Sequence, residues 1–423
     1  MSFKNCVFAA LCFIVLNPSS VSSAYALELK EHPKLQAIAD QLIDDKRYTQ
    51  KELEIVFSKA TVQQSVLDAM TNPAEYKFTW GKYRKLFLNQ DRIQQGVDFW
   101  TEYQQDFDRA EQEYGVPASV IVAIIGVESK YGRYKGSHKV LDSLVTLTVG
   151  FPRRSKFFGS ELKQFLILSK ENDLAFDEVL GSYAGAVGFP QFISSSYRNY
   201  AVDFSGDGKT DLIYQPIDAI GSIANYFIKN GWKPGEPVTS KAHLTVVASV
   251  ADLANRKRET RFTAGLLRDK GATLADTIKD DEKLNVLMLD ANEIVSEPKT
   301  SNIYIVRSGD TVCQIAEKLD VSCKALFSLN EINKKGHIFR GQRLKLPAKA
   351  TTSKGSKWQV SSGDQVEPVN TVQARFFFTH RNFYAITQYN HSVLYAMAVN
   401  DLSEAIDAAK LVSDKTSNRD DTE

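Results

Sequence analysis

The sequence predicts a mainly α-helical protein of the α+β class, and three segments carry this prediction. Residues 27–115 read as a series of helices with polar faces, and a strongly apolar helix follows near residues 117–131. Residues 302–347 instead read as strand, helix, helix and strand, which is typical of a small separate module. We therefore expect a helical main body and one small βααβ module.

Length and charge limit the classes of protein that fit. The chain has 423 residues, of which 43% are hydrophobic and 24% charged. That length suits roughly two to four domains, each with its own core. The 52 Lys and Arg residues nearly cancel the 51 Asp and Glu residues, and the net charge of +1 argues against a basic nucleic-acid binder or an acidic disordered chain. We expect that the protein has no nucleic-acid partner. We also expect it to be a monomer.

The N-terminus has the pattern of a secretory signal peptide. A basic start at Lys4 precedes an apolar run over Cys6–Leu16 and a small-residue exit at Ala24–Ala26. The run is too short for a bilayer, which needs about 20 residues, and the alternative is an N-terminal core helix. Cys12 faintly resembles a lipid-acylation site, but its apolar region would be very short. We expect residues 1–26 to be removed and the mature protein to be exported without a lipid anchor.

The C-terminal third contains two cysteines, a linker and a tail. Cys313 and Cys323 remain after signal cleavage, and export favours a disulfide between them over two buried thiols. Residues 348–372 are small and polar, as in a linker. Residues 373–411 turn aromatic and then helical, whereas the polar residues 412–423 are expected to be disordered.

One carboxylate lies on the apolar face of the central helix. Ile121, Ile124, Ile125 and Glu128 follow the spacing i, i+3, i+4 and i+7, so they share one face. Apolar surroundings are expected to raise the pKa of the Glu128 carboxyl, as a general acid requires. The alternative is a glutamate at a helix end that pairs with Lys130 or an arginine.

Several short motifs occur in order along the chain. They are Pro73–Glu75, Ile124–Gly132, Pro152–Arg154, Gly181–Ala186, Gln191-Phe192, Asn225–Phe227 and Arg381–Ser392. Together they resemble the lytic murein transglycosylase B family. The resemblance covers most of residues 30–290 and 373–410, and its many motifs in register make it specific. Ser129, Ser194 and Gln388 depart from the residues usual in that family, which are Thr, Pro and Arg.

The resemblance implies a lysozyme-like catalytic region over residues 27–300, completed by residues 373–411. Such enzymes cleave the MurNAc–GlcNAc bond of peptidoglycan and leave a 1,6-anhydromuramyl end, in the periplasm of Gram-negative bacteria. Glu128 matches the single catalytic acid/base. The residues that match a groove for glycan strands and stem peptides are Arg153, Arg154, Ser182, Gln191, Tyr226, Tyr384 and Tyr389.

Two other functions stay open at this point. A muramidase would break the same bond with water and would need a second carboxylate, for which Asp142 and Asp177 are candidates. A wall-binding scaffold would have a dead active site. The intramolecular reaction needs only one carboxylate, because the substrate's own C6 hydroxyl attacks and no water has to be activated.

Residues 203–209 resemble the start of a calcium loop. Asp203, Ser205 and Asp207 occupy positions 1, 3 and 5, and Gly208 occupies position 6. Position 12 is Tyr214, which excludes a standard EF-hand. The family resemblance implies a longer loop that Asp218 closes, to which Lys209 would contribute its carbonyl. A structural calcium ion is expected here, and the alternative is a solvated Asx-turn cluster.

Residues 302–347 resemble a LysM domain, a module that binds chains containing N-acetylglucosamine. The matching features are Gly309–Thr311 after the first strand and Gly341–Pro347 at the closing strand. The resemblance places the glycan groove between Gly309, Asp310 and Thr311 on one loop and Asn330 and Asn333 on the other. A Cys313–Cys323 bridge would staple this small core. Because the family signature resumes after it, the module is expected to be an insertion in the catalytic region.

Overall fold

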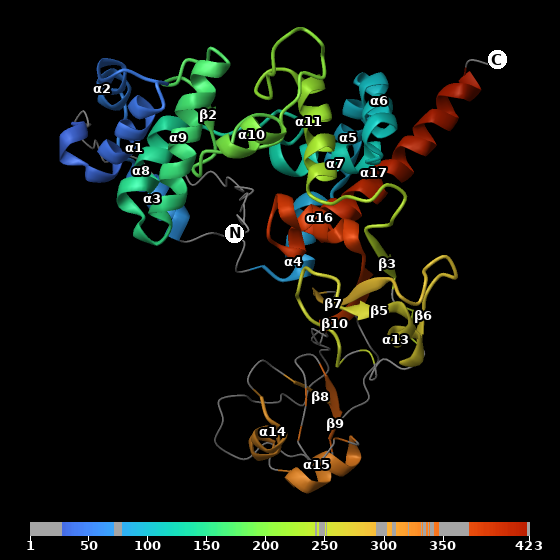
Figure 1. The fold of residues 1–423 in the computed structure, drawn as a ribbon. Coiled ribbons are helices and arrows are strands. Elements are labelled where there is room, and N and C mark those ends of the chain that lie inside the picture. The colour runs from blue at the N-terminus through green and yellow to red at the C-terminus, as the bar shows by residue number, and fades with distance from the viewer. Residues whose placement is uncertain are drawn as a thin grey trace, which may run out of the picture. The chain divides into compact units, whose positions relative to one another are not determined.

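The computed structural model divides into two compact units, each of which is described by itself (Figure 1). The main unit contains residues 1–78, 83–287 and 377–423, and the second unit contains residues 79–82 and 288–376. The predicted signal peptide and most of the predicted linker lie outside the described residues. The structure describes residues 28–71, 78–241, 243–244, 250, 252–292, 303–306, 310–319, 321–330, 332, 336, 338, 342–346 and 372–420.

The first part of the main body is helical, as the sequence predicts. Helix α2 begins with a capping box, in which the Thr49 side chain and the Glu52 side chain each accept a backbone N–H of the other residue. None of the helices in the described part of the chain has the length and apolar character needed to cross a bilayer. The elements are η1 (Leu29–Glu31), α1 (Pro33–Asp44), α2 (Gln50–Ser58), α3 (Gln64–Thr71), α4 (Trp80–Phe87), α5 (Gln90–Glu102) and α6 (Gln104–Tyr114).

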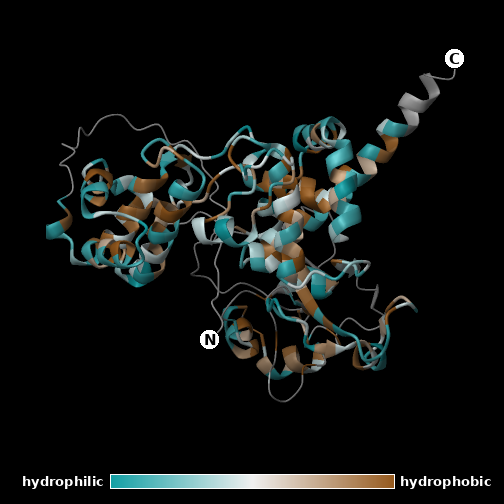
Figure 2. Ribbon diagram, turned by 45° about the horizontal axis from the view of Figure 1, so that its top comes forward, coloured by the Kyte–Doolittle hydropathy of each residue, from teal (hydrophilic) through white to brown (hydrophobic). Residues whose placement is uncertain are grey.

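Helix α7 (Ala118–Ser129) forms the centre of the main unit. Every residue of α7 except Ser119 is buried, because α5, α6, α11 and the C-terminal helix α17 (Val393–Asp420) all pack against it (Figure 1). Figure 2 shows apolar and hydrophilic residues interleaved along the helices of the main unit, as expected where helices at the surface bury only one face. The remaining helices of this region are α8 (Val140–Gly150), η3 (Pro152–Arg154), α9 (Ser155–Glu171), α10 (Ser194–Tyr200), α11 (Pro216–Lys229) and α16 (Arg381–Tyr389).

Short strands accompany the helices. One sheet has the order β3-β10-β7-β5, and two further pairs are β4 with β6 and β1 with β2. β3 and β10 are antiparallel, with Ser240 opposite Phe378. The strands are β1 (His138–Lys139), β2 (Leu180–Gly181), β3 (Thr239–Lys241), β4 (His243–Leu244), β5 (Phe262–Thr263), β6 (Ala272–Thr273), β7 (Lys283–Asn292) and β10 (Val372–Thr379), and α13 (Ala264–Asp269) follows β5.

A buried histidine joins this sheet to α16. His380 is the residue before α16, and its backbone N–H donates to the carbonyl of Val238 at 3.0 Å. Its ring nitrogen Nε2 lies 2.9 Å from Ser240 Oγ, and Nδ1 lies 3.3 Å from Glu282 Oε1. Burial lowers the pKa of His380, and the Glu282 carboxylate opposes that shift.

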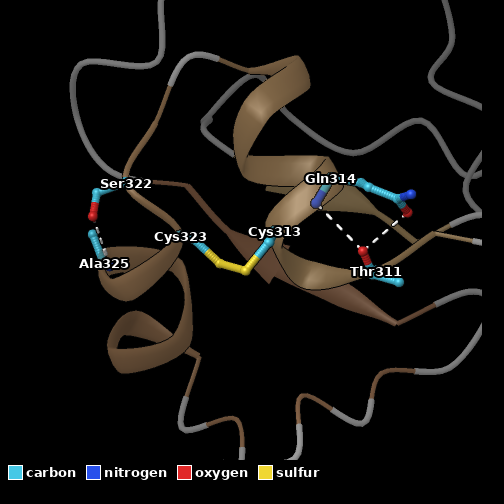
Figure 3. Close-up of a disulfide and its surroundings, with 6 residues drawn as sticks. All are labelled: Thr311, Cys313, Gln314, Ser322, Cys323 and Ala325. Atoms are coloured by element: carbon cyan, nitrogen blue, oxygen red, sulfur yellow. Dashed lines mark hydrogen bonds between the residues drawn. A yellow bond between two sulfur atoms is a disulfide. The ribbon is translucent and has the colours of Figure 1, made fainter.

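The second unit contains the predicted βααβ module, with β8 (Ile303–Ile305), α14 (Val312–Lys318), α15 (Cys323–Leu329) and β9 (Arg343–Lys345). β8 and β9 are antiparallel. Figure 3 shows the Cys313–Cys323 disulfide between the starts of the two helices. Thr311 and Ser322 cap these helices through their side-chain oxygens. The core consists of Val306, Val312, Ile315, Ala316, Leu326 and Leu344.

The predicted disorder of residues 412–423 is wrong for most of that segment, because α17 continues to Asp420. The sequence from Val393 to Asp420 contains no Gly or Pro, so nothing interrupts the helix once packing has started it. Lys410 also donates to Asp414 one turn later, at 2.6 Å. Polarity alone was therefore a poor guide to disorder here.

Candidate active site

Glu128 lies at the last turn of α7 and is only 9% exposed. The phenol of Tyr395, which comes from α17, donates a hydrogen bond of 2.5 Å to Glu128 Oε1. These residues are 267 positions apart in the chain, so the contact depends on the packing of α17 against α7. The catalytic candidate is thus a buried carboxylate with a fixed neutral donor.

Tyr395 belongs to a buried aromatic cluster. Its ring stacks with that of Tyr389, with centroids 6.4 Å apart and an interplanar angle of 13°. Tyr389 in turn contacts Tyr226 edge-on at 4.9 Å. Burial raises the pKa of Tyr395 well above its usual value, and the charge of Glu128 adds to the shift. The phenol therefore stays protonated and remains a hydrogen-bond donor at every physiological pH.

Tyr395 is not among the site residues that the sequence predicts. A signal was present, since Tyr395 is an aromatic hydroxyl within an otherwise apolar stretch, six residues after the predicted Tyr389. A buried phenol usually needs a polar partner. The sequence gives no indication of which buried polar group that partner would be.

The backbone turns sharply after Glu128. Lys130, Tyr131 and Gly132 have φ angles of 51°, 59° and 77°, a left-handed run that is uncommon for residues other than glycine. Serine at position 129 stabilises the turn, because its Oγ accepts the N–H of Gly132 at 3.0 Å. A side chain at Gly132 would overlap the ring of Phe189. After the turn, the backbone N–H of Tyr134 donates to the carbonyl of Ser129 at 2.9 Å, which ties the following loop to the end of α7. Backbone strain of this kind is typical of functional sites.

A second loop, residues 181–192, packs against this turn. Gln191 has a φ of 49°, and its side-chain amide donates to the carbonyls of Lys135 at 3.1 Å and Gly188 at 2.9 Å. The Oγ of Ser182 accepts the N–H groups of Ala184 at 3.3 Å and Ala186 at 3.0 Å. The structure therefore shows Ser182 and Gln191 as residues that hold the loops in shape.

Four of the predicted groove residues are buried. Ser182, Gln191, Tyr226 and Tyr389 are each less than a tenth exposed. The Tyr226 phenol donates to the carbonyl of Gln388 at 2.7 Å, and the Tyr389 phenol donates to that of Pro190 at 2.5 Å. In this conformation, therefore, the two tyrosines support the site from the interior and do not offer their rings to a ligand.

The other three predicted groove residues reach the surface. Arg153 is exposed, whereas Arg154 and Tyr384 are half-buried. The Arg154 guanidinium lies over the ring of Phe157, 4.0 Å from its centroid. These two arginines and Tyr384 are thus the predicted groove residues that are accessible at the surface.

The two candidate second carboxylates have structural partners. Asp142 accepts the backbone N–H of Thr61 at 2.9 Å and its hydroxyl at 2.8 Å. Asp177 forms an ion pair with Lys59 at 2.7 Å, and this hydrogen bond lowers the pKa of Asp177. Both therefore anchor the segment around residues 59–61. Their partners favour a structural role over water activation.

The candidate calcium loop is built from backbone N–H bonds. Asp203 accepts the N–H groups of Gly206 at 2.7 Å and Gly208 at 2.8 Å. Asp218 is fully buried and accepts three N–H groups, from Phe204, Ser205 and Asp211. Within the described residues, no group of three or more His, Cys, Asp or Glu side chains is arranged to hold a metal ion. The exposed loop offers oxygen atoms, and Asp218 contacts the loop through backbone N–H bonds.

The predicted glycan-binding residues of the module are only partly described. Gly309 and Asn333 lie outside the described residues. Asp310 accepts the Tyr304 phenol at 2.8 Å and pairs with Lys318 at 3.2 Å. Thr311 is exposed, and the Asn330 side chain donates to the carbonyl of Leu326 at 2.9 Å. Asp310 and Asn330 thus fix the loop ends of this module.

Comparison with solved structures places the fold among the lysozyme-like lytic transglycosylases. SltB1 from Pseudomonas aeruginosa is 33% identical, with a TM-score of 0.66 over 89% of this chain and 98% of that chain. Slt35 from Escherichia coli, solved in complex with bulgecin A, is 30% identical, with a TM-score of 0.67 over 92% and 97%. The predicted fold class is confirmed.

Sequence comparison then identifies the family. Residues 30–307 match the Transglycosylase SLT domain, so the chain belongs to this family, and residues 304–347 match the LysM domain. A curated relative, membrane-bound lytic murein transglycosylase B of Escherichia coli, is 36% identical over 272 residues, or 62% of this chain and 74% of the relative. The protein is therefore a lytic transglycosylase that carries a LysM domain.

Proposed function

We propose that this protein cleaves the MurNAc-β-1,4-GlcNAc bond of peptidoglycan without water and leaves a 1,6-anhydroMurNAc end. The observation that carries the proposal is the buried Glu128 carboxyl, held by the Tyr395 phenol at 2.5 Å. The name of the Escherichia coli relative, which specifies murein, supports the substrate. The structural roles of Asp142 and Asp177 disfavour the hydrolytic alternative.

In the proposed mechanism Glu128 acts twice. As an acid it gives its proton to the glycosidic oxygen while the bond to C1 of the muramyl residue breaks. As a carboxylate it then takes the proton from the C6 hydroxyl, whose oxygen attacks C1 and closes the anhydro ring. Glu128 ends protonated, as it began, so the cycle is balanced. Much of the rate would come from holding the sugar so that its own hydroxyl reaches C1.

The hydrogen bond from Tyr395 gives the two carboxyl oxygens of Glu128 different roles. Since the phenol occupies Oε1, we assign the proton transfers to Oε2. The hydrogen bond also stabilises the carboxylate between the two steps, because a donor bond favours the charged form. Arg153, Arg154 and Tyr384 are proposed to contact the glycan and the stem peptide at the surface.

The proposed setting is the periplasm of a Gram-negative bacterium, after removal of residues 1–26. The LysM module is proposed to hold the enzyme on glycan strands and so raise the local substrate concentration. A structural calcium ion is proposed at the loop of Asp203, Ser205, Asp207 and the Lys209 carbonyl, with Asp218 as a support of the loop. Slt35 was solved in complex with calcium.

The proposal is tested by release of soluble fragments from purified murein. Glu128→Gln keeps the shape of the side chain but removes the proton, and we expect activity to fall by at least about a thousandfold. Asp98→Asn is the matched control, because Asp98 is an exposed carboxylate on α5 that bonds only locally, to Gln94. Full activity of Glu128→Gln would overturn the assignment.

A further inference from the structure

An exposed tyrosine and a lysine form a small platform beside the loop of residues 181–192. Tyr214 is 75% exposed, the highest exposure among the large hydrophobic side chains that the structure describes at the surface. The Lys135 ammonium lies 5.4 Å from the centroid of the Tyr214 ring and 4.6 Å from that of Phe189. It also donates to the carbonyl of Ile213 at 2.7 Å. We call Tyr214 and Lys135 the rim platform.

The rim platform is joined to the catalytic loops by the backbone. Lys135 belongs to the loop that returns from the strained turn after Glu128, and its carbonyl accepts the side chain of Gln191. The N–H of Phe189 donates to the carbonyl of Leu212 at 2.9 Å, which fixes the segment leading to Tyr214. One residue, Lys135, therefore contacts a predicted groove residue through its backbone and Tyr214 through its side chain.

The two side chains offer complementary chemistry. A tyrosine ring presents a rigid apolar face with a polar edge, and an exposed ring of this kind suits stacking against the C–H face of a sugar. The half-buried Lys135 ammonium has lost part of its hydration. Burial lowers the pKa of Lys135, and the nearby Asp211 carboxylate opposes the shift. A partly desolvated cation beside an open ring is suited to a ligand that has both a saccharide ring and a carboxylate.

We propose that the rim platform binds a muramyl residue of the strand outside the cleaved bond, with its ring on Tyr214 and its carboxylate on Lys135. The carboxylate is that of the lactyl group where the strand is bare, or that of the stem peptide where it is not. The proposal rests on the proposed function, because it takes peptidoglycan as the substrate. It makes the platform a determinant of strand length and charge preference.

The test compares Tyr214→Ala, Tyr214→Phe and Lys135→Met with the wild type on murein glycans of increasing length. Tyr214→Ala is expected to raise KM on long strands about three- to tenfold, the equivalent of one aromatic contact. The effect should be absent on the shortest cleavable oligosaccharide, and Tyr214→Phe should restore the wild-type KM. Ile55→Ala, on the exposed face of α2 at 48% exposure, is the control for loss of an exposed hydrophobic side chain.

Lys135→Met keeps the packing of the side-chain stem against the rings but removes the charge. Wild type should bind strands with free carboxylates more tightly than strands whose carboxylates are amidated, and Lys135→Met should lose this preference. An unchanged preference, or an unchanged KM for Tyr214→Ala on long strands, would overturn the proposal. An equal loss on short and long substrates would also overturn it.

The proposed function and the platform fail in different ways. Binding is therefore also measured by titration in the Glu128→Gln background, where no turnover occurs. If the wild type leaves murein intact, the proposed function fails. If the wild type cleaves murein while Tyr214→Ala in this background binds long strands as tightly as its parent, only the platform fails.

Discussion

The seam between α7 and α17 and the LysM module are stabilised in opposite ways. At the seam, Glu128 and Tyr395 meet across 267 residues and are buried by helix packing. In the module, a small core, of which six buried residues are described, is closed by a disulfide between residues ten apart. The proposed catalytic pair therefore depends on long-range packing, whereas the LysM module depends on local links. Each should therefore respond to different damage.

The largest expected effect is on the module. Replacing both Cys313 and Cys323 by serine should lower its free energy of unfolding by about 3 kcal/mol, as expected for a short closed loop. Chemical denaturation followed with a glycan-binding readout measures this change. The main unit should keep its denaturation midpoint and its activity on short glycans. An equal shift in the denaturation midpoint of the main unit would contradict the view that the two regions are stabilised independently.

Tyr395→Phe tests the seam itself. Removing the phenol leaves the ring in place but takes the donor from Glu128 Oε1, so kcat should fall by about ten- to a hundredfold, the value of a hydrogen bond to a charged group. Tyr389→Phe is the matched control, because it loses an equally short bond to a backbone carbonyl and not to Glu128. Equal kcat values for the two variants would argue against the role assigned to Tyr395.

The calcium loop is a third region, and a single buried carboxylate, Asp218, stabilises it by accepting backbone N–H groups. Asp218→Asn removes the charge that accepts three N–H groups and should lower the free energy of unfolding by about 1–3 kcal/mol. Thermal unfolding should show the same loss with calcium and with a chelator. A loss of unfolding free energy that occurs only in calcium-containing buffer would instead identify Asp218 as a metal ligand.

The smallest expected effect is the contribution of His380 to the loss of stability at acidic pH. The folded pKa of His380 is lowered by burial, so the unfolded chain binds a proton more readily than the native one. Stability should therefore fall as pH drops below the unfolded value of about 6.5, with a slope of at most about 1.4 kcal/mol per pH unit from this group. His380→Gln should flatten the dependence in urea denaturation between pH 7.5 and 5. Identical slopes would mean that groups other than His380, such as His138, whose pKa is also lowered by burial, set the acid sensitivity.

The sequence predicts local features, such as the helix that carries Glu128, but it does not predict contacts between residues that are far apart in the chain. The spacing of Ile121, Ile124 and Ile125 predicts that Glu128 lies on an apolar face of a helix, and Glu128 is indeed buried. However, nearly every residue of α7 is buried, so the burial of Glu128 comes from packing on all sides of the helix and not from one apolar face. The partner of Glu128 could not be predicted, because no spacing in the chain relates Tyr395 to it. The motifs predict Tyr226 and Tyr389 as groove residues, but both are buried, and their burial depends on how α11 and α16 meet around them.

The most direct test of the account is cleavage of murein in water labelled with heavy oxygen, with mass spectrometry of the new ends. The account predicts anhydromuramyl ends, one water lighter than reducing ends and without the label, from the wild type. Glu128→Gln should produce none. Reducing ends that carry the label would contradict the account, since water and not the C6 hydroxyl would then have attacked the muramyl carbon.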